Sequence, residues 1–211
     1  MSRRLPAIWR VMQRAALAAA ILCLGLAVAQ AHPHVWVTVE ATVIYDAKKQ
    51  VTGIKEQWTF DKAYSEYALD GLEKDAGGNY TPAAFVALAK ENMESLKDYN
   101  YFTEVYVEGA RVEMGPPESA VVTRDDKTIL HLTYTMPLKQ PVNVGTLKFS
   151  FLIYDPEFYI AFAFAEKDPV HLAPGAPARC ASRIEPPTGD PTKSKTWGGA
   201  YAATVVVSCG G

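Results

Sequence analysis

The sequence predicts an α+β domain that consists mainly of antiparallel β-sheet in a sandwich-like arrangement, with two helices inserted between strands. Segments in which apolar and polar residues alternate run through most of the chain, and this alternation is typical of half-buried strands. Residues 62–98 instead carry apolar side chains at helical spacing. Helices segregated from a largely antiparallel sheet define the α+β class.

The first two strands are predicted at residues 35–45 and 54–60, joined by a turn at residues 46–53. The two open ends of such a hairpin lie together, so we expect His34 and Asp61 at the same end of the sheet. The remaining strands are predicted at residues 101–107, 111–114, 119–124, 128–134, 146–154, 158–165 and 202–208. The segment 146–154 becomes wholly apolar, as expected of a central strand covered on both faces.

Two helices are predicted within the insertion. The first covers residues 64–72. The second begins at Thr81 and Pro82, a pair typical of a helix start because threonine caps the first turn and proline suits the first helical position. The apolar stripe of the second helix predicts a packing surface against the sheet, and it is made of Phe85, Leu88, Ala89, Met93 and Leu96.

Residues 1–31 have the features of a secretory signal peptide. Four arginines precede an uncharged apolar run at residues 15–29, and Ala29-Gln30-Ala31 is a cleavage signal. An uncleaved membrane anchor is the alternative, but the run is shorter than the roughly 20 residues that span a bilayer. The sequence therefore predicts a single periplasmic domain, residues 32–211, that is not embedded in the membrane.

The charge of the predicted mature chain argues against nucleic acid as a partner. The leader contains four of the 21 basic residues and none of the 23 acidic ones, which leaves a formal charge of −6. An acidic chain without a basic cluster is a poor ligand for nucleic acids or anionic membranes.

The mature chain keeps two cysteines, Cys180 and Cys209. In an oxidising compartment two such residues most simply form a disulfide. We therefore expect a disulfide that fastens the C-terminal segment, residues 185–211, to the domain.

Cleavage after Ala31 would expose an N-terminal histidine. His32 would then offer its α-amine and imidazole to one metal ion, and His34 a second imidazole; such nitrogen ligands suit zinc, copper, nickel and cobalt. Pro33 has no amide proton, which excludes the coordination mode that uses deprotonated backbone amides. The alternative is a polar terminus without a metal.

Two carboxylates are the expected further ligands of this divalent transition metal. Asp61 should lie near His34, and Asp155 precedes Pro156 between two apolar strands. An Asp-Pro pair is also favoured in turns, and the turn and ligand roles are compatible. His131 in a strand and His171 in a loop are interpreted as surface residues rather than ligands.

Common enzyme motifs are missing from the sequence: there is no G-x-S-x-G elbow, Gly-rich phosphate loop or H-E-x-x-H. We therefore expect a protein that is not an enzyme. Two alternatives remain. A copper enzyme with an N-terminal histidine brace would need a further histidine, for which His131 is the strand candidate. A protein-interaction module would expose its aromatic side chains and bind no metal.

Three motifs resemble an uncharacterised bacterial periplasmic family described as ABC-type transport substrate-binding proteins. They are His-Pro-His-Val-Trp at residues 32–36, Trp-Thr-Phe-Asp-Lys-Ala-Tyr-Ser at 58–65 and Tyr-Asp-Pro-Glu-Phe-Tyr at 154–159. Members are associated with nickel/cobalt-type efflux permeases and metal uptake. The resemblance implies metal ligands at His32, His34, Asp61 and Asp155, and a periplasmic metal-binding protein that exchanges ions with an inner-membrane metal permease.

Overall fold

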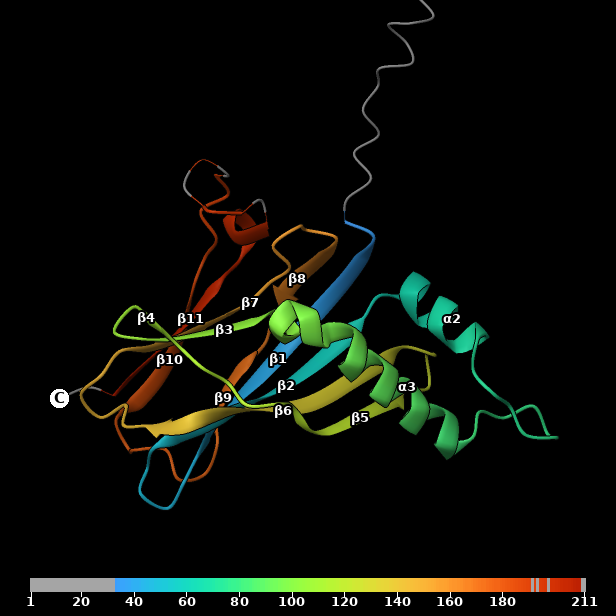
Figure 1. Cartoon of the computed structure of the whole chain (residues 1–211), viewed down its shortest axis with the longest axis horizontal. Coiled ribbons are helices and arrows are strands. Elements are labelled where there is room, and N and C mark those ends of the chain that lie inside the picture. Colours follow the sequence, from blue (N-terminus) through green and yellow to red (C-terminus); the bar gives the residue numbers. More distant parts are fainter. Residues whose placement is uncertain (1–32, 191, 193, 197, 210–211) are drawn as a thin grey trace, which may run out of the picture. The chain divides into compact units, whose positions relative to one another are not determined.

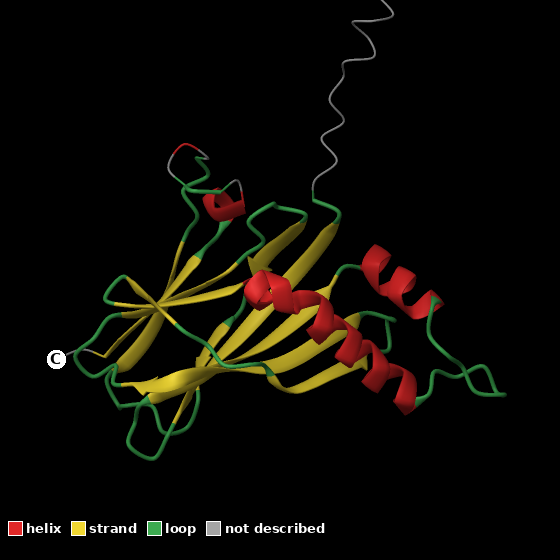
Figure 2. Ribbon diagram, in the orientation of Figure 1, coloured by secondary structure: helices red, strands yellow, loops and turns green. Residues whose placement is uncertain are grey.

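The computed structural model describes residues 33–190, 192, 194–196 and 198–209, and within them it confirms the α+β class (Figures 1 and 2). Two open, mostly antiparallel sheets are accompanied by two α-helices. The strands are β1 (Val35–Tyr45), β2 (Val51–Phe60), β3 (Thr103–Val107), β4 (Ala110–Val112), β5 (Glu118–Arg124), β6 (Leu130–Val142), β7 (Phe149–Ile153), β8 (Ile160–Phe164), β9 (Val170–Leu172), β10 (Cys180–Glu185) and β11 (Thr204–Cys209). The helices are α2 (Lys62–Asp70) and α3 (Pro82–Leu96), with 3₁₀ turns η1 (Lys97–Phe102) and η3 (Gly198–Tyr201).

The first sheet has the strand order β5-β6-β2-β1-β8, and β9 also pairs with β1. β1 and β2 form the predicted antiparallel hairpin, in which Val37 lies opposite Phe60. On its other side β1 pairs in parallel with β8, where Val35 lies opposite Ile160. The start of β1 therefore lies between the end of β2 and the start of β8.

The second sheet has the order β10-β11-β7-β3-β4. Alternate residues of both sheets are buried and form one hydrophobic cluster, because successive side chains of a strand point to opposite faces. The central members of this cluster are Val39, Val43, Ile54, Trp58, Leu132, Val105, Phe149, Phe151, Val205 and Val207.

Both helices begin where side chains cap them. Asp61 accepts a hydrogen bond from the Tyr64 N–H at the start of α2, and Thr81 accepts one from the Ala84 N–H at the start of α3, directly before Pro82. These caps satisfy N–H groups that have no partner within the helix. The predicted start of the second helix is confirmed, and α3 packs against the edge strand β5 (Figure 1).

The predicted end of the strand at residues 128–134 is wrong, because β6 continues through Pro137 and Pro141. Proline cannot donate to the ladder and is tolerated at irregular positions. The partner strand β2 is irregular at this level, with a register shift between Val51 and Gly53. A Cβ on Gly53 would lie 2.7 Å from the Met136 carbonyl oxygen, so only glycine allows the two backbones to approach here.

Three further differences follow from long-range pairing. β9 and β10 were not predicted, and His171 lies in β9 instead of a loop. β7 is central in its sheet as expected, but Ser150 and Leu152 are only half-buried, so the strand is not covered on both faces. A three-residue strand such as β9 has too few residues to show a period.

The expected disulfide is present. Cys180 and Cys209 are bonded and lie opposite each other on β10 and β11. Within the residues that the structure describes, no helix has the length and apolar character needed to cross a membrane.

Replacing both Cys180 and Cys209 with serine should lower the free energy of unfolding by about 3–4 kcal/mol, because the bond closes a chain separation of 29 residues. Denaturant unfolding of the oxidised protein and the double variant measures the difference. A reduced wild-type sample is the control and should match the variant. Equal stability of the oxidised protein and the variant would contradict the prediction.

Candidate metal centre at the start of β1

His34 is held at the start of β1 by Tyr159. The His34 N–H donates to the Tyr159 carbonyl oxygen at 2.8 Å. The two rings are stacked, with centroids 4.5 Å apart and planes inclined by 9°. His34 is exposed, and Tyr159 keeps 47% of its surface accessible. The backbone and the ring of His34 are therefore both placed by the segment that leads into β8.

Asp61 forms a reciprocal pair with Trp36. The Asp61 N–H donates to the Trp36 carbonyl oxygen at 2.9 Å, and the Trp36 N–H donates to Asp61 Oδ2 at 2.8 Å. The second carboxylate oxygen, Oδ1, accepts from the Tyr64 N–H at 3.0 Å and caps α2. Asp61 thus lies two residues along β1 from His34, and the prediction that both lie at one end of the sheet is confirmed.

Asp155 organises the turn before β8. Its Oδ1 accepts from the Glu157 N–H at 2.9 Å, its Oδ2 accepts from the Ile160 N–H at 2.9 Å, and its carbonyl accepts from the Phe158 N–H at 3.0 Å. The predicted turn role is therefore confirmed. The residue is only 4% exposed, so its carboxylate is reached mainly by the backbone of its own loop.

Gly198 packs against this turn through its backbone. Its N–H donates to the Pro156 carbonyl oxygen at 3.0 Å, and a Cβ at this position would lie 1.6 Å from the Asp155 carbonyl oxygen. Only glycine can occupy that position without moving the turn. The C-terminal segment is thus part of the structure that places Asp155 and Tyr159.

The structure brings three of the four nominated residues to one end of the first sheet. His34, Asp61 and Asp155 surround the start of β1, whereas His32 lies outside the described residues. Among the described residues, no group of three or more His, Cys, Asp or Glu side chains has the arrangement of a metal site. The described residues by themselves therefore do not make up a metal site.

The other two histidines lie elsewhere. His131 is on β6 opposite Thr59, its Nδ1 lies 2.9 Å from Thr59 Oγ1, and its Nε2 lies 3.8 Å from Asp125 Oδ2. Thr59 pairs with Thr38, four residues along β1 from His34, a separation of about 13 Å. His171 lies further along β1, opposite Thr42. Neither histidine is brought to His34, so His131 is not the further ligand that a histidine brace would need.

The sequence did not predict that Tyr159 contacts His34. Tyr159 does so only because β8 pairs in parallel with β1, a long-range arrangement that no local pattern predicts. The signal that existed was the Asp-Pro turn, which placed a polar segment at a strand end.

These features define an α+β protein with two open sheets. At one end of the first sheet, an exposed histidine lies beside two carboxylates that bind backbone N–H groups. The chain belongs to the family described as Protein of unknown function (DUF1007), whose model matches residues 17–209. It is also similar to an uncharacterized protein of Haemophilus influenzae, with 24% identity over 144 residues that cover 68% of each chain.

Replacing Asp155 with asparagine should lower the free energy of unfolding by about 1–3 kcal/mol, because the amide group would face a buried backbone N–H that needs an acceptor. Denaturant unfolding measures the change. The matched control is Asp126→Asn, at an exposed turn position, which should stay within about 0.5 kcal/mol of the wild type. Equal effects of the two substitutions would contradict the structural role of Asp155.

Proposed function

We propose that this protein is a periplasmic, non-enzymatic protein that binds a divalent transition metal and serves as an accessory or substrate-binding component of a metal transport system. Zinc, nickel, cobalt and copper are the candidate ions. The observation that carries the proposal is the placement of His34, two residues after the expected first residue of the mature chain, beside Asp61.

The anchoring of His34 supports this site. The hydrogen bond to the Tyr159 carbonyl and the ring stack hold the imidazole at the sheet end. A metal binds imidazole nitrogen in the plane of the ring, so a neighbour stacked on the ring face is compatible with coordination. In the sequence only Pro33 separates the anchored His34 from His32.

The proposed first ligands are the α-amine and imidazole of His32 and the imidazole of His34. Asp61, which is bound to the backbone of Trp36, supplies a carboxylate, and each of its oxygens retains a second lone pair beyond its backbone hydrogen bond. Asp155 acts through the backbone of Ile160 and the turn that carries Tyr159. In this assignment the histidines bind the metal, Asp61 completes the coordination and Asp155 positions the surroundings.

The transport role rests on the resemblance of the three motifs to periplasmic proteins linked to nickel/cobalt-type permeases. The disulfide supports an oxidising compartment, because such bonds persist outside the cytoplasm. The proposed partners are therefore the metal ion and an inner-membrane metal permease.

The joint replacement of His32 and His34 with alanine should weaken metal binding by at least about a hundredfold, equivalent to about 2.8 kcal/mol, because three of the proposed nitrogen ligands become one. Isothermal titration with each of the four metals measures this on protein exported with its own leader. Mass spectrometry of each sample must first confirm that the chain begins at residue 32.

His171→Ala is the matched control, since this exposed histidine lies far along β1 from His34. It should bind metal as the wild type does. Unchanged affinity in the double variant, with an intact fold and the expected first residue, would overturn the proposed site.

Insertion of one alanine between Ala31 and His32 tests the amine separately. The insertion keeps both imidazoles but moves the α-amine away from the His32 ring. The affinity for zinc, which does not displace backbone amide protons, should therefore fall because the amine and the His32 imidazole no longer form a direct chelate. Titration of the inserted chain, again with its first residue verified, gives the answer. Wild-type affinity would exclude the amine as a ligand.

Metal affinity should decrease as the pH is lowered, because a protonated imidazole or amine cannot bind a metal ion. Titrations between pH 8 and pH 5 measure this change. The double histidine variant is the reference, and its residual binding should depend less on pH. Affinity of the wild type that does not change over this range would contradict nitrogen ligation.

A further inference from the structure

A carboxyl group is buried between the two sheets, away from the candidate metal centre. Glu56 lies on β2 between core positions and has no exposed surface. Its Oε2 accepts from Trp58 Nε1 at 2.9 Å and from the Tyr134 hydroxyl at 3.0 Å, and its Oε1 lies 2.8 Å from Thr103 Oγ1. Because Thr103 begins β3, this network joins the first sheet to the second.

The Thr103 hydroxyl has two acceptors and one hydrogen. It lies 2.8 Å from Glu56 Oε1 and 3.0 Å from the Tyr101 carbonyl oxygen. If Glu56 is ionised, the Thr103 hydroxyl donates to the carboxylate and no longer donates to the Tyr101 carbonyl. If Glu56 carries a proton on Oε1, the acid donates to Thr103 and Thr103 donates to Tyr101. The protonated form therefore satisfies both contacts of the Thr103 hydroxyl.

The protonation state is set by the surroundings of the carboxyl. Burial raises the pKa of Glu56 to about 7, although the hydrogen bonds from Trp58, Thr103 and Tyr134 act to lower it. The titratable group in contact with Glu56 is the phenol of Tyr134 on β6, whose hydroxyl lies 3.0 Å from Glu56 Oε2 and 3.5 Å from the Tyr101 carbonyl oxygen. The phenol of Tyr101 on η1 acts in turn on Tyr134 and raises its pKa. Burial and the Glu56 charge raise the pKa of Tyr134 well above its usual value, so it remains a donor.

The Tyr101 carbonyl lies in a strained backbone segment. Asn100, Tyr101 and Phe102 are consecutive residues with φ of 50°, 54° and 55°, in the left-handed region. This conformation costs about 1–2 kcal/mol per residue without glycine, and it persists only where the surroundings hold it. The bond from Thr103 is one such restraint. The packing of the buried Phe102 ring against Trp58 and Phe162 is another.

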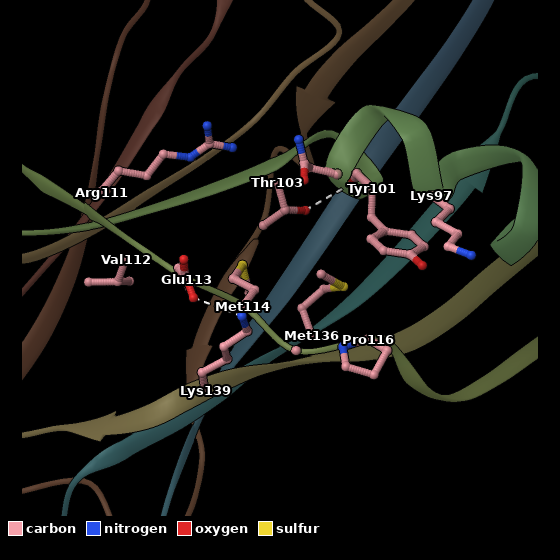
Figure 3. Close-up of a pocket in the computed structure, with 12 residues that line it drawn as sticks. Lys97, Tyr101, Thr103, Arg111, Val112, Glu113, Met114, Pro116, Met136 and Lys139 are labelled. Atoms are coloured by element: carbon pink, nitrogen blue, oxygen red, sulfur yellow. Dashed lines mark hydrogen bonds and ion pairs between the residues drawn. The ribbon is translucent and has the colours of Figure 1, made fainter.

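The strained segment forms one wall of a cleft of about 590 Å³ between the sheets. Figure 3 shows Tyr101 and Thr103 on this wall, with Met114 and Met136 across the cleft and the hydrogen bond from Thr103 drawn to the Tyr101 backbone. The charged groups nearest the Tyr101 phenol are Lys97 and Glu94, which also pair with each other. Asn100 and Tyr101 therefore belong both to the strained segment and to the lining of the cleft.

We propose that Glu56 is a buried proton switch that controls the wall of the inter-sheet cleft. With a proton on Glu56, Thr103 donates to the Tyr101 carbonyl and the left-handed segment is held. When the proton leaves, the Thr103 hydroxyl turns to the carboxylate. The Tyr101 carbonyl then keeps only the Tyr134 hydroxyl, which lies 3.5 Å away and is already shared with Glu56 Oε2, and the segment at residues 97–103 relaxes. The two states exclude each other because the Thr103 hydroxyl has a single hydrogen. The strain in the segment favours its relaxation once that hydrogen is withdrawn.

The sign of the linked stability change follows from proton binding. A folded-state pKa of about 7 against 4.5 for a free carboxyl means that the folded protein binds the extra proton between these values. The stabilisation that the proton on Glu56 provides is complete below pH 4.5. It decreases as the pH rises and is lost once the pH has risen through about 7. The released segment should open first, because it carries the strain.

Hydrogen exchange of residues 97–103 tests the switch, after correction for the intrinsic effect of pH on exchange. In the wild type, the protection of this segment should fall by about tenfold between pH 6 and pH 8. Glu56→Gln, which cannot ionise, should lose this dependence, because its amide can donate to Thr103 at every pH. Protection that does not change in the wild type, or that changes equally in Glu56→Gln, would overturn the proposal.

A matched pair at Thr103 keeps the test decisive if Glu56→Gln does not fold. Thr103→Ser retains the hydroxyl relay and should retain the pH-dependent protection, whereas Thr103→Val removes the relay and should abolish it. Infrared difference spectra of the wild type should show loss of a protonated carboxyl band over the same pH range. Equal behaviour of the serine and valine variants, or absence of that band, would contradict the switch.

Discussion

The reciprocal pairing of Asp61 with the backbone of Trp36 is the interaction on which the candidate metal centre depends. One carboxylate oxygen binds the Trp36 N–H, the other starts α2, and the Asp61 N–H closes the pair through the Trp36 carbonyl. The end of β2, the start of α2 and the start of β1 are thereby joined at one residue. Because β8 pairs with the opposite edge of β1, the same strand end also receives Tyr159, and the position of His34 follows from both contacts.

The centre of the domain combines apolar packing with one buried carboxyl. The inward faces of the two sheets meet in a single hydrophobic cluster, into which Trp58 and Tyr134 project together with Glu56. A buried acid is costly unless its oxygens are hydrogen-bonded, and here partners from three strands satisfy them. The carboxyl therefore connects the sheets where apolar contacts alone would not specify their relative position. The strained segment at residues 100–102 lies directly beside this connection.

Local patterns predicted the elements better than their partners. The alternation in β1, the cap at Thr81 and the cysteine pair each report a short-range rule, and each was confirmed. β9 has only three residues and β6 contains two prolines. The alternation of apolar and polar residues therefore did not predict β9 or the full length of β6. The position of Glu56 did contain a signal, because it occupies an inward position in the alternation of β2 and a charged residue there predicts a buried network. The alternation does not show which residues the Glu56 carboxyl contacts.

By itself, the sequence determined the α+β class, the hairpin that brings His34 and Asp61 together, and the cysteine pair that forms the disulfide, because each depends on local period or on few residues. The tertiary structure alone decided that both aspartates bind backbone N–H groups, that Tyr159 stacks on His34, and that Thr103 and Tyr134 meet Glu56. The physical reason is that these contacts join strands far apart in the chain, and their register is set by the packing of whole sheets.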